Sequence, residues 1–361
     1  MAAWSDRRRI GEIQWLRAVA ALMVVAAHIK IALDLRYYGL SFEQSPLSPF
    51  PFVAGVDVFF VISGFVMAHS SQSLHGQSGA WRTFLLRRLA RVAPLYWLMT
   101  VLLIVLLIVA RVPVWAETTP TQIVASFLFF PAANPDGVPL PLLDIGWSLN
   151  YEMLFYAVFA LFVGWRQRIA LGATFAVLII GVVAGRWLTP SSLALRFWSD
   201  PIVLEFLLGI AIYLVVSRGF RLPDALRWLV GGAGLLLFFA FPQIDFTWRF
   251  LQWGIPSGLM VLAAVSGRRE TRSSVAEWAG NTSYAIYLSH FFVIRALLFG
   301  LEHLGIRAPA VWLVGFPIGV VLGTLIAASV LHYGFERPVL RWIRRHLDRD
   351  VLQGVGAPSG P

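Results

Sequence analysis

The feature that most constrains this chain is a series of apolar stretches, each long enough to cross a lipid bilayer. A hydrocarbon core of ~30 Å requires about 20 apolar residues per helix. Hydrophobic residues make up 58% of the sequence and charged residues only 13%, whereas an ordinary soluble domain is about 45–50% apolar. We therefore predict an all-α polytopic membrane protein, a bundle of about ten transmembrane helices. The expected spans are approximately 12–33, 52–70, 91–111, 146–164, 168–188, 200–217, 226–242, 248–266, 280–300 and 309–334.

The arginines indicate how such a bundle is oriented, because positive charge accumulates in cytoplasmic loops. With the N-terminus inside, most arginines fall in cytoplasmic segments, and both termini are expected to be cytoplasmic. The net charge of +10 then reflects topology and contact with anionic membrane lipids, and we expect no nucleic-acid partner. We expect a transmembrane domain over 1–345 and a disordered tail over 346–361. The opposite loops hold only Arg36, Arg111, Arg186, Arg196, Arg249 and Arg307.

Arg17 and His28 lie eleven residues apart inside the first apolar stretch. This spacing is almost three helical turns, so both side chains leave one face of a helix, about 16 Å apart along its axis. An arginine within a span is disfavoured by roughly 2.5 kcal/mol or more, and such residues usually face a cavity or a partner. We interpret the pair as part of a site. The alternative is that Arg17 extends to the cytoplasmic headgroups and His28 bonds a neighbouring carbonyl group.

Other polar residues fall at definable depths within the predicted spans. Because the helices alternate in direction, we expect His290 near the middle of the membrane and a polar layer in the outer half. That layer is expected to contain His28, Asp57, Glu152 and Glu205, and Trp147 and Ser148 are expected in the outer part of the fourth span.

An arginine-rich segment, 81–97, leads into the third span and contains Arg87, Arg88 and Arg91. Guanidinium groups suit phosphate oxygens, although anchoring by positive charge is an alternative reading. The chain has no cysteine, which excludes thiolate chemistry, and its histidines show no metal-ligand spacing, so we expect no metal. A basic inner end and a polar outer layer indicate a donor bound inside and an acceptor reached outside.

Six motifs in order give the chain a family resemblance over nearly its whole length. It resembles the membrane-bound acyltransferase-3 family and, within it, the ExoZ-like exopolysaccharide O-acetyltransferases. The motifs are Arg17-x10-His28, Gly55–Phe65, Arg87–Trp97, Trp147–Glu152, Gly280–His290 and Phe335–Pro338.

The resemblance implies a bacterial inner-membrane enzyme that transfers an acyl group, acetyl first, from acetyl-CoA or another acyl-CoA to a saccharide hydroxyl. It implies that His28 is the catalytic group and that a polysaccharide biosynthesis complex is a further partner. The residues implied to hold the anionic donor are Arg17, Arg87, Arg88 and Arg91.

An imidazole with a free pKa of about 6.5 is suited to take a proton from a sugar hydroxyl that attacks a thioester. Asp57 or Glu152 would orient that imidazole or bind the sugar. An acyl-enzyme on His28, Ser63, Ser148 or Ser289 is a competing mechanism. The residues expected to contact the acceptor are Trp147, Ser148, Glu205, Tyr287 and His290.

Several alternatives remain open at this point. Tyr287 and His290 would also serve as hydrogen-bonding groups between helices. Glu336 and Arg337 are expected to form a local ion pair. The same polar track would suit a transporter of a glycan precursor, in which no bond changes, or a non-catalytic scaffold of an assembly complex.

Overall fold

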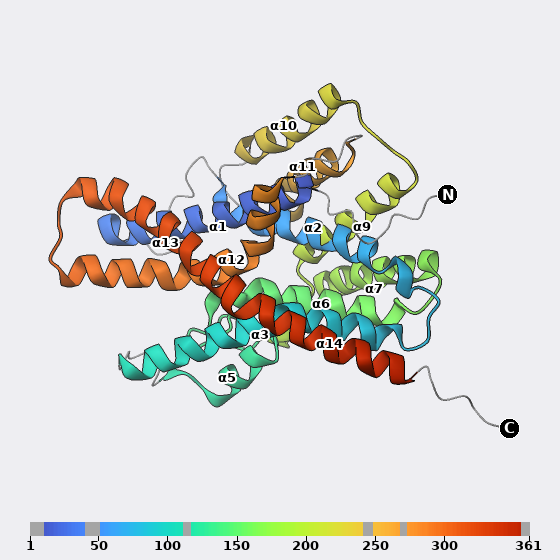
Figure 1. Cartoon of the computed structure of the whole chain (residues 1–361), viewed down its shortest axis with the longest axis horizontal. Coiled ribbons are helices and arrows are strands. Elements are labelled where there is room, and N and C mark those ends of the chain that lie inside the picture. The colour runs from blue at the N-terminus through green and yellow to red at the C-terminus, as the bar shows by residue number, and fades with distance from the viewer. Residues whose placement is uncertain (1–10, 40–50, 111–116, 241–247, 268–272, 355–361) are drawn as a thin grey trace.

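A computed structural model describes residues 11–39, 51–110, 117–240, 248–267 and 273–354, with side chains up to residue 346. Every regular element in these residues is a helix (Figure 1). The long helices are α1 (Gly11–Tyr38), α3 (Ala80–Val109), α7 (Gln167–Leu188) and α12 (Ser274–His303). The other α-helices are α2 (Gly55–Ser70), α5 (Pro120–Phe127), α6 (Trp147–Phe162), α8 (Leu193–Trp198), α9 (Leu204–Ser217), α10 (Asp224–Ala240), α11 (Ile255–Val265), α13 (Phe316–Leu331) and α14 (Arg337–Gly354).

Short 3₁₀ and π segments extend or join several of these helices. The 3₁₀ segments are η1 (Phe52–Ala54), η2 (Gln72–Leu74), η3 (Asp144–Gly146) and η4 (Pro201–Val203). The π segments are η6 (Phe250–Gly254), η7 (Val311–Gly315) and η8 (His332–Glu336).

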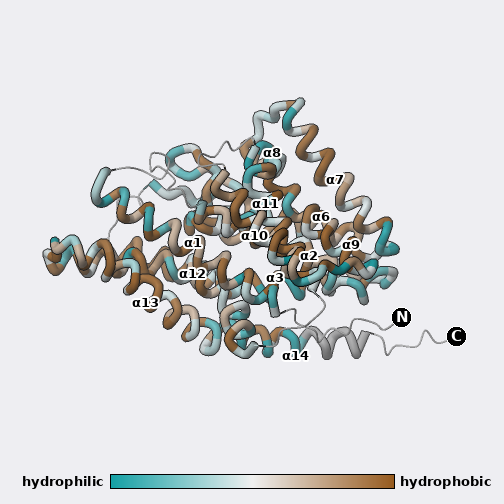
Figure 2. Tube along the Cα trace, turned by 90° about the horizontal axis from the view of Figure 1, so that it is seen from above, coloured by the Kyte–Doolittle hydropathy of each residue, from teal (hydrophilic) through white to brown (hydrophobic). Residues whose placement is uncertain are grey.

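The predicted fold class is confirmed. Each of the ten expected spans coincides with a helix, and seven helices of the described chain are long and apolar enough to cross a membrane. Shorter apolar helices cover Pro201–Ser217 and Phe250–Val265. Along α7, Figure 2 shows hydrophobic residues in the middle and hydrophilic ones toward the ends, and α13 is hydrophobic over most of its length. Both features are those of a polytopic membrane protein, while the cytoplasmic placement of the termini stays a prediction.

Two boundaries differ from the expectation. The arginine-rich segment is part of α3, which begins at Ala80, so its arginines lie on the same continuous helix as the apolar span. The tail expected to begin at residue 346 starts inside α14, which continues to Gly354, and its remainder lies outside the described residues.

The helix pairs that surround the site have defined relative directions. Gln14 of α1 faces Gly280 near the start of α12, and Arg36 pairs with Glu302 near the far ends of the same helices, so α1 and α12 run parallel. Because both helices are odd-numbered spans in the expected order, a parallel arrangement is what alternate crossing requires.

Close packing of α2 against α9 depends on small residues. A Cβ atom added at Gly64 would lie 1.9 Å from the carbonyl oxygen of Phe206, and one added at Gly209 would lie 2.1 Å from the carbonyl oxygen of Val61. Glycines at such positions allow two helix backbones to approach within van der Waals contact. This contact fixes the position of α2, which carries Asp57 and Ser63.

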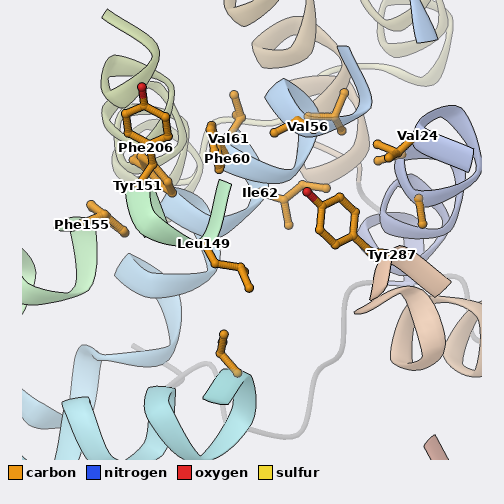
Figure 3. Packing of buried hydrophobic residues seen from close by; sticks show 14 of the residues in the cluster. Val24, Val56, Phe60, Val61, Ile62, Leu149, Tyr151, Phe155, Phe206 and Tyr287 are labelled. Atoms are coloured by element: carbon orange, nitrogen blue, oxygen red, sulfur yellow. The ribbon is translucent and has the colours of Figure 1, made fainter. Parts of the chain in front are cut away.

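An aromatic cluster fills the space between α2, α6 and α9. The Phe206 ring lies 4.6 Å from that of Phe60 and 4.5 Å from that of Phe155, measured between centroids. In Figure 3, Tyr287 of α12 lies on the other side of α2 and directs its hydroxyl group toward Ile62. The polar residues that α2 and α6 carry are therefore held in position by a closely packed apolar core.

Candidate active site

A cavity of about 130 Å³ lies between α1, α2, α3, α6 and α12. Its apolar wall includes Val56, Phe60, Ile62 and Leu149, which Figure 3 shows among the buried core residues. A volume of this size accommodates several water molecules or a small ligand group. Its charged lining consists of Arg17, Arg88, Arg91 and Glu152.

The three arginines come from two helices. Arg88 and Arg91 lie one turn apart on α3 and face the cavity, and Arg17 reaches it from α1. Arg88 donates a hydrogen bond of 2.6 Å to the Ser70 hydroxyl, whereas Arg17 donates none to any described residue. The structure thus brings together three of the four arginines expected to bind a donor. Arg87 is exposed and does not line the cavity.

Glu152 lies among these arginines. Its Oε1 atom accepts hydrogen bonds from the Ser63 hydroxyl, at 3.0 Å, and from the Tyr156 hydroxyl. It also attracts Arg17 and Arg88 electrostatically. The carboxylate is therefore already engaged by two donors and two cations.

The expectation that Glu152 and Asp57 share one polar layer is wrong. Ser63, the partner of Glu152, lies six residues beyond Asp57 on α2, which is about 9 Å along the helix. The reason is that Asp57 occupies the first turn of α2 whereas Glu152 lies more than a turn inside α6. The position of a residue within a predicted span gives its depth in the membrane only as precisely as the ends of that helix are predicted.

Two tyrosines of α12, Tyr284 and Tyr287, line the cavity and hold its wall together through their hydroxyl groups. The Tyr287 hydroxyl donates a hydrogen bond of 2.6 Å to the carbonyl oxygen of Ile145, so the Ser148 hydroxyl, 2.9 Å away, is the donor to Tyr287. Tyr284 donates to the carbonyl oxygen of Val92 at 2.8 Å. These bonds join α12 to α3 and to the start of α6.

The two histidines of interest pack against each other behind Tyr287. The ring centroids of His28 and His290 are 4.8 Å apart, with an angle of 62° between the rings. The Nδ1 atoms lie 2.9 Å from the carbonyl oxygen of Val24 and 3.3 Å from that of Ile286, respectively. A carbonyl oxygen can only accept, so Nδ1 carries the proton in each neutral ring and Nε2 carries the lone pair.

The cavity as it stands does not reach His28. Neither histidine is among the described residues that line it, and one lining side chain, Tyr287, has its ring centroid 6.0 Å from that of His290. Ring contacts thus connect the cavity residue Tyr287 to His290, and His290 to His28.

Asp57 belongs to a separate buried ion pair. Arg249 donates to its two oxygens from Nε at 3.0 Å and from Nη2 at 2.8 Å, and the Arg249 guanidinium also lies 5.4 Å from the Trp147 ring and 5.2 Å from the Trp253 ring. Glu205, fully buried, lies within electrostatic range of both, and neither of its oxygens has a hydrogen-bond partner in the described chain. Asp57 and Glu205 thus lie together, apart from the cavity.

Arg249 is the main residue that the sequence analysis misplaced. Its place at the edge of the expected span 248–266 predicts an outer-loop arginine, but it is only 5% exposed. The signal was available, because two acidic residues predicted inside spans require a positive partner. An arginine at the end of a span can point to the outer surface or into the protein, and counting arginines for topology does not distinguish the two.

The described side chains thus define a multi-pass membrane protein whose buried arginine-lined cavity ends next to a histidine pair. The chain belongs to the acyltransferase-3 family, whose model, described as an acyltransferase domain, matches residues 10–332. It is accordingly a membrane-bound acyltransferase. No solved structure matches the chain.

The relatives found by sequence comparison agree with this membership. The chain is 34% identical to the exopolysaccharide production protein ExoZ of Rhizobium meliloti over 80% of this chain and 89% of that protein. It is 26% identical to the acyltransferase MdmB of Streptomyces mycarofaciens over 93% of each chain. It is also 25% identical to the peptidoglycan O-acetyltransferase OatA of Listeria monocytogenes, over 92% of this chain and 56% of OatA.

Proposed function

We propose that this acyltransferase moves an acyl group, acetyl first, from an acyl-CoA bound at the arginine end of the cavity to a hydroxyl group of a surface saccharide or its lipid-linked precursor. The observation that carries the proposal is the arginine cluster of the cavity, formed by Arg17, Arg88 and Arg91. These cations exceed the carboxylates that line the same space, and Arg17 has no hydrogen-bond partner among the described residues. Such an arrangement favours a ligand with several negative charges, as a coenzyme A thioester has.

The acceptor class is proposed from the relatives. ExoZ is named for exopolysaccharide production and OatA for O-acetylation of peptidoglycan. Trp147 is partly buried, 5.9 Å from Tyr151 between ring centroids, and its indole is an aromatic ring of the kind on whose face sugars stack.

The chemistry assigns His28 as general base. Its Nε2 takes the proton from the sugar hydroxyl while the oxygen attacks the thioester carbonyl carbon, and the tetrahedral intermediate then expels the thiolate. The proton passes from the imidazolium to the sulfur, which leaves as the free thiol, and the sugar retains the ester. Tyr287 separates His28 from the present cavity, so the reaction requires this side chain to move or the acyl group to pass beside it.

The test is transfer of label by the purified protein. We expect radiolabelled acetyl from acetyl-CoA to appear as alkali-labile ester on an added saccharide acceptor or on membrane glycan extract. We expect no label with a folded His28→Ala variant. Saccharide moved across a vesicle membrane without any labelled ester would contradict acyl transfer and favour a transporter.

A further inference from the structure

The cavity is elongated, because one face of α2 lines it over three helical turns. The α2 residues that line it include Val56, Phe59, Phe60, Ser63 and Met67. Residues three or four positions apart share one side of a helix. From Val56 to Met67 this wall is about 16 Å long at 1.5 Å per residue. The two ends of the cavity can therefore be compared.

The charged residues lie toward one end of the cavity. Arg88 donates a hydrogen bond of 2.6 Å to the hydroxyl group of Ser70, three residues beyond Met67 on α2. Glu152 lies nearer the middle, where its Oε1 atom accepts a hydrogen bond of 3.0 Å from Ser63. The arginine end is the part of the cavity beside Arg88.

Arg17 also leaves its helix before the other end of the cavity is reached. Gln14 of α1 faces Gly280 of α12, and the two helices run parallel. Three residues further along each helix lie Arg17 and Ser283, which both line the cavity. Tyr287 follows four residues later on α12, so Arg17 leaves α1 about one turn before the level of Tyr287.

The first turns of α2 and α6 form the opposite end, which is apolar apart from two hydroxyl groups. Its apolar lining includes Val56, Phe60 and Leu149, each of them at most 4% exposed. The hydroxyl groups are those of Ser148 and Tyr287, which are hydrogen-bonded to each other at 2.9 Å. The apolar end is this part of the cavity.

Aromatic rings close the apolar end. The Tyr287 ring lies 6.3 Å from that of Phe59, measured between centroids. The Phe60 ring lies 6.4 Å from that of Trp147 and 4.6 Å from that of Phe206. Closely packed rings yield little, so a ligand that enters this end has room for a short chain only. A carboxylate at the tip of such a chain would lose its water among apolar side chains, which is costly.

We propose that the apolar end binds the acyl group of the donor and restricts it to a short, uncharged chain, with Val56 and Leu149 as specificity-determining residues. The inference rests on the proposed function, in which the arginine end binds the anionic part of an acyl-CoA. With the phosphates at that end, the pantetheine arm follows the length of α2 and the thioester lies beside Tyr287. The Tyr287 ring is 6.0 Å from that of His290, so this position also brings the acyl carbon next to the histidine pair.

The wild-type protein should discriminate among acyl-CoA donors by chain length and by charge. The kcat/KM should fall at least tenfold from acetyl-CoA to hexanoyl-CoA, because one methylene group in a hydrophobic pocket is worth about 10–200-fold. It should fall at least as much from acetyl-CoA to succinyl-CoA, because the succinyl carboxylate would be desolvated. Use of hexanoyl-CoA or succinyl-CoA as efficiently as acetyl-CoA would overturn the inference.

Two valines of α2 provide a matched pair of variants. Val56 lies at the apolar end, whereas Val66 lines the cavity about 15 Å away, one turn before Ser70. Val56→Ala should raise the ratio of kcat/KM for hexanoyl-CoA to that for acetyl-CoA at least threefold, and Val66→Ala should leave this ratio within about 1.5-fold of the wild type. Leu149→Ala should raise it at least tenfold. If Leu149→Ala does not fold, the valine pair decides, and equal ratios in the two folded valine variants would overturn the inference.

Photocrosslinking locates the acyl group without requiring transfer. The probe is a thioether analogue of acyl-CoA, which cannot transfer its chain, with a diazirine at the end of that chain. In the Leu149→Ala protein, or in Val56→Ala, the enlarged apolar end should place the probe against Phe59 or Phe60, and acetyl-CoA should suppress the crosslinks. Crosslinks confined to Val66 and its neighbours, or none that acetyl-CoA suppresses, would overturn the inference. Crosslinks at Phe59 or Phe60 in a protein that transfers no acyl group would refute only the transfer reaction.

Discussion

The buried ion pair between Asp57 and Arg249 allows the sharpest test of the packing described above. Arg249 is the positive partner of Asp57, which is fully buried, and it also lies within electrostatic range of Glu205, which is equally buried. Removing one partner of a buried pair costs about 3–5 kcal/mol, because the other charge stays in a low-dielectric environment. Arg249→Met leaves two acidic groups without a cation, so it should destabilise the protein by at least this amount.

Replacing the acidic partner of the pair should reduce the stability of the protein less. In Asp57→Asn the guanidinium loses its bidentate partner but keeps Glu205 as a neighbouring carboxylate. The double variant Asp57→Asn, Arg249→Met should recover part of the loss of Arg249→Met, because replacing both members of a buried pair is often nearly neutral.

The assay is equilibrium unfolding in mixed micelles followed by tryptophan fluorescence, with acyl transfer measured on each folded variant. Equal losses for the two single variants, or a double variant less stable than Arg249→Met, would refute the reasoning. Because the sequence analysis also placed Asp57 with the catalytic group, activity discriminates between the roles. A folded double variant with full acyl transfer would make Asp57 structural, and one without activity would restore the catalytic assignment.

Three further outcomes are expected. His28→Ala should fold and lose about 10²–10⁴ in kcat, the usual contribution of a general base, so near-normal acylation would exclude that role. Arg88→Ala should raise the KM for acetyl-CoA about tenfold or more at physiological salt, because a hydrogen bond to a charged group is worth about 1.5–3 kcal/mol. The control is Arg82→Ala, which changes an exposed arginine of the same helix. Equal effects of the two substitutions on KM would contradict a contact between Arg88 and a donor phosphate. Gly64→Ala should destabilise the protein by about 1–3 kcal/mol through overpacking against the Phe206 backbone, and an unchanged unfolding midpoint would show that α2 and α9 can separate without cost.

Much of the fold could be predicted from the sequence because the bilayer imposes one strong length requirement. All ten expected spans coincide with helices for this reason. What could not be predicted is which polar side chains meet, because lateral packing depends on close contacts such as Gly64 against Phe206. These contacts set the neighbours of Asp57 without leaving a periodic signal in the sequence.

The candidate site, too, could be predicted from the sequence only in part. Arg17 and His28 share a helix, so their common face follows from spacing alone. The contact between His28 and His290 joins α1 to α12, and the ion pair between Asp57 and Arg249 joins α2 to the residue that precedes η6. Both contacts depend on tertiary structure.

Three groups of polar side chains in the described part of the protein differ in how their charges are paired, and this difference favours one of them as the ligand-binding site. Arg249 is paired bidentately with Asp57, and the imidazoles of His28 and His290 each bond a carbonyl oxygen of their own helix. Only the cavity gathers more guanidinium groups than lining carboxylates, and there Arg17 donates no hydrogen bond to a described residue. Cations withdrawn from water are costly unless they are paired, so an excess of half-buried guanidinium groups around a cavity is best explained by an anionic ligand that neutralises them on binding.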